Sequence, residues 1–239
     1  MELTVLGMNG PFPSPGGATS GYLVSAGETR VQLDLGSGTL AALTAVTAPE
    51  SLTALVLSHW HYDHCSDVLP LVFRLEAMAQ EPLHIYAPAD EHSLVRQAVQ
   101  GCAKMTLHDI APGDEITLGD MKLTAYQARH PVPALMYRLE AEGKTLCYTG
   151  DTNTVDGLVD FARKADLLLA DGLFPQAAWA EGKPHLSAAL AAETARDAQV
   201  KRLVVTHLNP LIDPVGLISE ARAIRPDVIR ARRGDVYIL

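Results

Sequence analysis

Four potential metal ligands lie within six residues of one short segment, VLSHWHYDHC at positions 56–65. They are His59, His61, Asp63 and His64. Neutral imidazoles and carboxylates are ligand types that zinc accepts, and that manganese and iron accept less selectively. Because side chains two residues apart can point the same way in an extended segment, His59 and His61 can share one ion while Asp63 and His64 face a second point. The spacing therefore predicts a site for two metal ions.

Further ligands must come from later in the chain, and three candidates each follow a predicted apolar strand. They are His130 in QARHPVPALMYR, Asp151 in LCYTGDT and His207 in RLVVTHLNP. Loops that project from a rigid sheet are where catalytic groups commonly collect. Three other histidines lack this placement and are interpreted as residues of the surface or the core edge: His84, His92 and His108.

Two aromatic residues, Trp60 and Tyr62, alternate with the ligands. They could line a substrate wall, because an aromatic ring combines a large apolar surface with a polar tip. We predict instead that both pack backwards into the core.

A sheet must position these residues, and the hydrophobic patterning predicts one. Apolar runs bounded by turn residues predict strands near 3–6, 21–25, 30–35, 52–58, 83–87, 122–127, 135–140, 145–149, 166–170 and 202–206. Helical patterning predicts helices near 39–47, 66–79, 90–100, 155–164, 187–198 and 214–224. Strands with helices interspersed fit an α/β (α+β) fold of two sheets covered by helices on their outer faces.

Composition limits the protein class. The 239 residues are 48% hydrophobic, which is enough for a large core in one or two domains. Three scattered cysteines without a CxxC motif predict reduced thiols. The net charge of −9 argues against binding to long nucleic acid or to an anionic membrane. Since no apolar run approaches the length of a membrane helix or a secretory signal, we expect a cytoplasmic protein.

The motifs together resemble a known family. SHWHYDH resembles the HxHxDH signature of the metallo-β-lactamase fold hydrolases, and the later candidates resemble the remaining ligand motifs of that family in order. Other segments resemble the ribonuclease Z and phosphodiesterase branch, and within it the short bacterial hydrolases: LTVLGMNGPFPSPGGATSGYLV, LDLGSG, RHPVPALMYR, YTGDT, LLLADGLF, PHLSAALAAETARDA and LVVTHL. The resemblance implies a single αββα sandwich domain over residues 1–239, with the site at one edge of two mixed sheets.

The resemblance also implies a ligand assignment for two divalent ions, with zinc expected and manganese or iron open. The first ion would be held by His59, His61 and His130, and the second by Asp63, His64 and His207. Asp151 would bridge the two ions. Asp34, in LDLGSG, resembles a residue that orients the ligand loop; a turn-forming aspartate before Gly36 is the alternative.

The implied chemistry is hydrolysis. Two ions about 3.5 to 4 Å apart can share a water, supply hydroxide and neutralise phosphoryl oxygens. His185, in KPHLSAALAAE, resembles the histidine that donates a proton to the leaving alkoxide, with a surface histidine before Ser187 as the alternative. Asp171 lies where the branch often has a glutamate that assists this histidine, and its shorter side chain leaves the assistance open. Asp63 joins His185 and Asp171 among the expected catalytic residues.

These expectations lead to a substrate class. Only 20 residues separate His130 from Asp151, which leaves no room for the long arm by which ribonuclease Z holds transfer RNA. We therefore expect hydrolysis of a small phosphodiester, such as a cyclic nucleotide or a short nucleotide ester. A lactone, thioester or β-lactam hydrolase on the same metals is one alternative, and a catalytically idle metal-binding protein is another. A homodimer is possible by resemblance, although no heptad or apolar patch in the sequence supports it.

Overall fold

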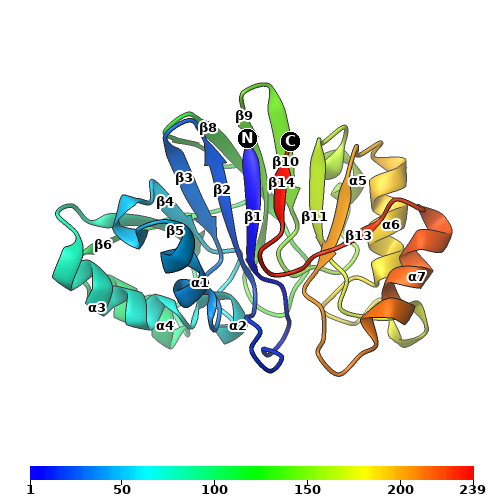
Figure 1. Ribbon diagram of the computed structural model, residues 1–239, viewed down its shortest axis with the longest axis horizontal. Helices are drawn as coiled ribbons and strands as arrows, with labels where there is room; N and C mark the ends of the chain where they lie inside the picture. The colour runs from blue at the N-terminus through cyan, green and yellow to red at the C-terminus, as the bar shows by residue number, and fades with distance from the viewer.

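Two seven-stranded sheets pack face to face in the computed structural model, which describes residues 1–239 (Figure 1). In spatial order, the first sheet consists of β14 (Val236–Ile238), β1 (Glu2–Gly7), β2 (Gly21–Ala26), β3 (Thr29–Leu33), β4 (Ala54–Val56), β5 (Leu83–Pro88) and β6 (Met105–Ile110). The second consists of β13 (Ile229–Arg230), β12 (Leu203–Thr206), β11 (Leu167–Asp171), β10 (Lys144–Tyr148), β9 (Leu135–Ala141), β8 (Met121–Gln127) and β7 (Glu115–Leu118).

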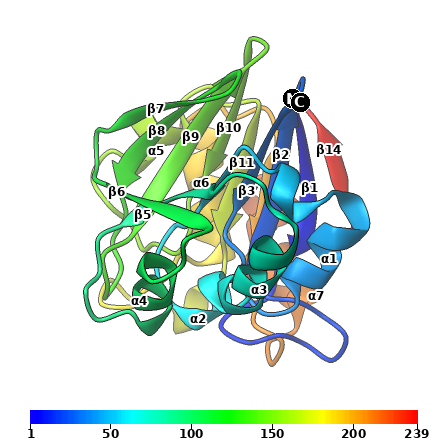
Figure 2. The same ribbon diagram turned by 90° about the vertical axis from the view of Figure 1, so that its left-hand side faces the viewer.

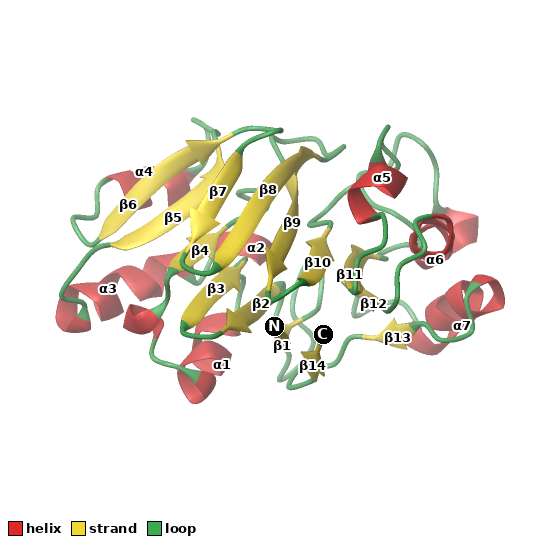
Figure 3. Cartoon of the chain, turned by 90° about the horizontal axis from the view of Figure 1, so that it is seen from above, coloured by secondary structure: helices red, strands yellow, loops and turns green.

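Helices cover the outer face of each sheet (Figure 3). The first sheet is covered by α1 (Thr39–Val46), α3 (Val68–Met78) and α4 (Leu94–Gln100). The second is covered by α5 (Leu158–Ala162), α6 (Ala188–Asp197) and α7 (Pro214–Ile224). The predicted αββα sandwich is therefore confirmed. No helix in the structure combines the length and the apolar character that a membrane crossing requires.

Three apolar layers hold this arrangement together. The central layer lies between the sheets and includes Leu33, Tyr137 and Val204, all fully buried. The other two layers lie between each sheet and its helices. Because most strands are buried on both faces, they appear in the sequence as nearly continuous apolar runs, as strand 167–171 does.

Strand direction explains why the candidate ligands lie at one edge. In the second sheet, β8 and β10 are both antiparallel to β9, while β11 and β12 run parallel to β10. The carboxyl ends of these four strands therefore meet at one edge. In the first sheet β3, β4 and β5 are parallel, and the ligand segment follows β4. A helical turn, α2 (Tyr62–Cys65), lies within this segment at the lower edge in Figure 1.

Several predicted boundaries were wrong, and four strands were missed. The strand predicted over 52–58 is shortened to β4, and the helix predicted from residue 90 begins at Leu94, because the Ser93 hydroxyl accepts the N–H of Arg96 there. The missed strands are β6, β7, β13 and β14, which lie at the outer edges of the sheets. Two of them, β7 and β14, are seen on opposite sides of Figure 2. Edge strands are partly solvated, so their sequences lack the buried pattern that identified the central strands.

Candidate metal centre

Three imidazoles meet where the two sheets adjoin at this edge. His61 Nδ1 lies 3.0 Å from His59 Nε2 and 3.0 Å from His130 Nε2. His59 and His61 come from the segment after β4, whereas His130 comes from the loop after β8 of the other sheet. Ligand atoms bound at about 2.0 to 2.1 Å to one zinc ion lie roughly 3 Å apart, so the spacing of these nitrogens fits a shared cation.

A second group of ligands lies beside the first. His64 Nε2 and His207 Nε2 lie 3.6 and 3.8 Å from Asp63 Oδ2. The carboxylate of Asp151 joins the two groups, because its Oδ2 lies 3.2 Å from His64 Nε2 and 3.6 Å from His59 Nε2. The structure thus brings together all seven residues that the resemblance assigned to the metals, and Asp151 belongs to both groups.

The hydrogen bonding of these residues fits metal ions. Four of their side-chain atoms are buried and have no hydrogen-bond partner: Asp63 Oδ2, His64 Nε2, Asp151 Oδ1 and His207 Nε2. Leaving a buried polar atom unpaired costs about 1 to 3 kcal/mol, and more for a charged group. All four atoms belong to the second ligand group, so a cation there would satisfy them together.

The protonation of the histidines also suits cation binding. Burial lowers the pKa of His59 and of His207, and it lowers the pKa of His130 to about 4. These rings are therefore neutral at neutral pH, with a lone pair available to a metal. Burial lowers the pKa of His64 as well, but the carboxylates of Asp151, Asp63 and Asp34 raise it by more. The carboxylates around His64 therefore favour a positive charge at the His64 ring.

Asp34 orients the ligand segment through hydrogen bonds. Its Oδ2 accepts hydrogen bonds from His64 Nδ1 at 2.7 Å, from the Ser58 hydroxyl at 2.8 Å and from the Tyr148 hydroxyl at 2.5 Å, and its Oδ1 accepts the Ser58 N–H at 2.6 Å. The Nδ1–H bond directs His64 Nε2 towards the second ligand group. Asp34 is not only a turn residue, although its φ of 50° does place it in the left-handed region.

His185 lies beside the ligands and is paired with Asp171. His185 Nδ1 donates to Asp171 Oδ2 at 2.9 Å and lies 3.8 Å from Asp151 Oδ2. Asp171 is fully buried at the end of β11 and also accepts the backbone N–H of Leu173. The aspartate is thus long enough to reach the histidine. Burial lowers the pKa of His185, but Asp171 and Asp151 raise it by more, to about 9.

The position of His185 is set by the start of α6. The Ser187 hydroxyl accepts the N–H of Leu190 at 3.0 Å and so caps this helix. His185 precedes the cap by two residues and is 7% exposed. The structure therefore does not support the alternative of an exposed surface histidine.

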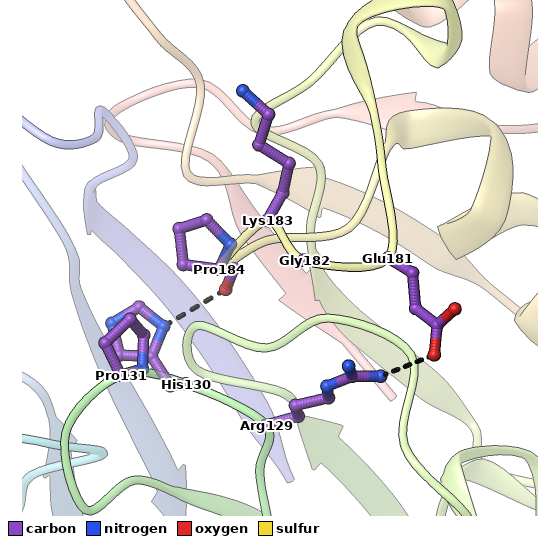
Figure 4. A pocket seen from close by; sticks show the side chains of 7 residues that line it. All are labelled: Arg129, His130, Pro131, Glu181, Gly182, Lys183 and Pro184. Atoms are coloured by element: carbon purple, nitrogen blue, oxygen red, sulfur yellow. Dashed lines mark hydrogen bonds and ion pairs between the residues drawn. The ribbon is translucent and has the colours of Figure 1, made fainter.

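A small polar pocket of about 190 Å³ adjoins His130 (Figure 4). His130 Nδ1 donates to the carbonyl oxygen of Pro184 at 3.1 Å, which links the loop after β8 to the segment that holds His185. Arg129 and Lys183 contribute two positive charges, and Glu181 lies 3.5 Å from the guanidinium of Arg129. The pocket lining therefore has a net positive charge in a protein of net charge −9.

Comparison with known proteins identifies the family. The beta-lactamase superfamily domain matches residues 22–208. The chain belongs to the metallo-β-lactamase superfamily. It is 31% identical to the probable metallo-hydrolase YhfI of Bacillus subtilis over 99% of both chains, and the crystal structure of YhfI superposes with a TM-score of 0.92 over 99% of this chain and 98% of YhfI.

Members of this superfamily named ribonuclease Z are also similar. The chain is 28% identical to ribonuclease Z of Methanopyrus kandleri over 98% of this chain and 96% of the relative. The short form of human tRNase Z superposes with a TM-score of 0.82 at 21% identity, over 100% of this chain and 99% of the human chain, which supports the fold. The chain is thus a metallo-hydrolase with ribonuclease Z-like relatives.

Other predicted residues lie outside the ligand groups or were misjudged. His84 and His92 are exposed, and His108 is half-buried on β6. Trp60 is buried as predicted, whereas the prediction for Tyr62 was wrong, because its side chain is 62% exposed. The helical turn α2 begins at Tyr62, and side chains no longer alternate between two faces once the extended backbone ends.

Sequence reasoning missed three residues that support the ligands. Ser58 bonds to Asp34, Tyr148 donates to Asp34, and the Ser20 hydroxyl lies 3.2 Å from His207 Nδ1. Ser58 directly precedes the first ligand, so its position was a usable signal. Tyr148 is 114 residues from Asp34, and no local pattern could have paired them.

Proposed function

We propose that the chain hydrolyses a small phosphodiester and that His185 protonates the leaving oxygen. The His185–Asp171 pair beside Asp151 carries this proposal. Two divalent cations, with zinc proposed, would supply an activated water and neutralise phosphoryl oxygens. The seven ligands of the two groups would hold these cations, and Asp63 would serve both as a ligand and as part of the catalytic machinery.

His185 supplies the proton in this proposal. The bond from its Nδ1–H to Asp171 fixes the ring and leaves Nε2 to hold the proton that a leaving alkoxide requires. The two carboxylates that raise its pKa keep the ring protonated at neutral pH. A carbonyl substrate that expels a thiolate has less need of this donor, which favours the phosphodiester over the thioester.

Two further features support a small anionic substrate. The pocket that adjoins His130 has a net positive lining, since it holds Arg129 and Lys183 but one acid, Glu181, and positive charge attracts an anion. The residues between His130 and Asp151 are largely taken up by β9 and β10, which a two-residue turn at Glu142 and Gly143 connects. No long segment is left there to hold a macromolecular substrate.

The test compares two leaving groups. In a His185→Ala variant, turnover of 3′,5′-cyclic AMP should fall by about 10²- to 10⁴-fold, because its leaving alkoxide needs a proton. Turnover of bis-p-nitrophenyl phosphate should fall much less, because nitrophenolate is a stable anion. Metal content, measured by mass spectrometry, should be unchanged.

His108→Ala is the matched control, since His108 lies on β6 away from the ligand groups, and both activities should survive it. An equal loss for the two substrates, or loss of metal, would contradict the role of His185. A wild-type protein that opens lactones or cleaves thioesters but neither phosphodiester would overturn the proposed function.

A further inference from the structure

A second pocket, of about 290 Å³, also borders the metal ligands. It is lined by Trp60, His61, Tyr62, Asp90, His92 and Ser93. His61 belongs to the first ligand group, so a molecule in this pocket adjoins the candidate metal centre. The volume is close to the lower end of the range for small-molecule sites.

The walls of this pocket are held in place by the fold. The Trp60 Nε1–H donates to the carbonyl oxygen of Pro88 at 2.7 Å, which fastens the ligand segment to the end of β5. At the start of α4, the Ser93 hydroxyl accepts the N–H of Arg96 and caps this helix. These contacts fix Trp60 and Ser93, two of the six lining residues, and both are buried.

Tyr62 gives the pocket an aromatic surface. Its side chain is 62% exposed, directly follows the ligand His61, and lines the pocket. An exposed ring of this kind can stack against a planar heterocycle, and stacking of a base on an aromatic side chain tolerates any base because every base has a π face.

Asp90 gives the pocket a hydrogen-bond acceptor. Its Oδ1 accepts the backbone N–H of His92 at 3.0 Å, which orients the carboxylate. Its Oδ2 remains able to accept a hydrogen bond from a ligand. An aromatic surface together with one oriented carboxylate matches a nucleobase that has an exocyclic amine.

We propose that this pocket binds the base of a nucleotide substrate, with the base stacked on Tyr62 and its exocyclic amine donating to Asp90. The proposal rests on the proposed function, since it places the phosphate of the same substrate at the candidate metal centre. It narrows the substrate class from small phosphodiesters in general to nucleotides with an amino-substituted base.

The test measures binding by calorimetry on the metal-loaded protein and needs no turnover. The wild-type protein should bind adenosine 5′-monophosphate roughly tenfold or more tightly than ribose 5-phosphate, which lacks the base. This ratio should fall towards one in Tyr62→Ala and persist in Tyr62→Phe, which keeps the ring. Phe73→Ala is the matched control, because Phe73 is an exposed aromatic on α3 that does not line the pocket.

The carboxylate is tested with a second pair of ligands. The wild-type protein should prefer adenosine 5′-monophosphate to inosine 5′-monophosphate, in which a carbonyl replaces the amine, and Asp90→Asn should reduce this preference. If the wild-type protein bound adenosine 5′-monophosphate and ribose 5-phosphate with nearly equal affinity, the proposal would be overturned. Hydrolysis of bis-p-nitrophenyl phosphate is assayed separately, so failure of phosphodiester hydrolysis and failure of base binding are distinguished.

Discussion

The Asp171 carboxylate sets the charge of its partner His185, and this interaction makes a prediction about pH. If His185 acts as a protonated acid, activity is lost as pH rises through its pKa. Asp171→Asn removes one of the two negative charges that raise that pKa, so the alkaline limb should move to lower pH. The measurement is kcat against pH for 3′,5′-cyclic AMP in both proteins. An unchanged alkaline limb would show that the pair does not control the proton.

Asp34 makes a second prediction at the scale of single residues. Asp34→Ala removes the acceptor that orients His64 and Ser58, so metal affinity should fall by about 10- to 100-fold. Competition with a fluorescent chelator measures this affinity directly. Asp120→Ala serves as the control, because Asp120 lies in the turn between β7 and β8, at the opposite end of β8 from His130. Unaltered metal affinity in Asp34→Ala would contradict the orienting role.

At the scale of elements, the loop after β1 is fitted closely around one ligand. Gly10 lies so near His207 that a Cβ added there would meet the imidazole ring 2.1 Å away. The loop is fixed at this distance because the Asn9 side chain and the Gly10 N–H both donate to the carbonyl oxygen of Leu208. Only glycine leaves room for the ring in this position.

Gly10→Ala should therefore displace His207 and weaken the second ligand group more than the first. We expect the number of tightly bound metals, measured by titration against a chelator, to fall from two towards one. Gly182→Ala is a matched control, because a Cβ there meets nothing within 4 Å. Two tightly bound metals in Gly10→Ala would mean that the loop yields without moving the ligand.

At the scale of the whole molecule, the two sheets share the candidate centre. Four ligands follow β4 of the first sheet, and three follow strands of the second. A cation bound by both sets links the two halves of the sandwich and stabilises the folded state alone, since the unfolded chain does not assemble the ligands.

Metal removal should therefore lower the melting temperature. At a free metal concentration 1,000 times the Kd, one site contributes about 4 kcal/mol, which corresponds to a fall of roughly 10 °C for a chain of this size. Calorimetry with and without chelator measures the shift, and zinc should restore it. In Asp151→Asn the shift should be smaller, and an equal shift there would contradict the bridging role.

The sequence alone determined the features that depend on neighbouring residues. His59, His61, Asp63 and His64 lie within one short segment, so their types and spacing already predicted a candidate metal site. The central strands were also predictable, because burial on both faces leaves a continuous apolar run. The later candidates His130, Asp151 and His207 were found from their positions after apolar strands, and the resemblance to the metallo-β-lactamase fold assigned them to the two ions. The structure brings them to the same edge.

Only the tertiary structure decided the features that depend on distant residues. The reach of Asp171 to His185 depends on where β11 ends relative to α6, and the bond from Tyr148 to Asp34 joins the two sheets. The exposure of Tyr62 depends on a single helical turn, and the edge strand β14 pairs with β1 from the other end of the chain. Local spacing carries no information on such contacts, because the packing of the two sheets fixes them.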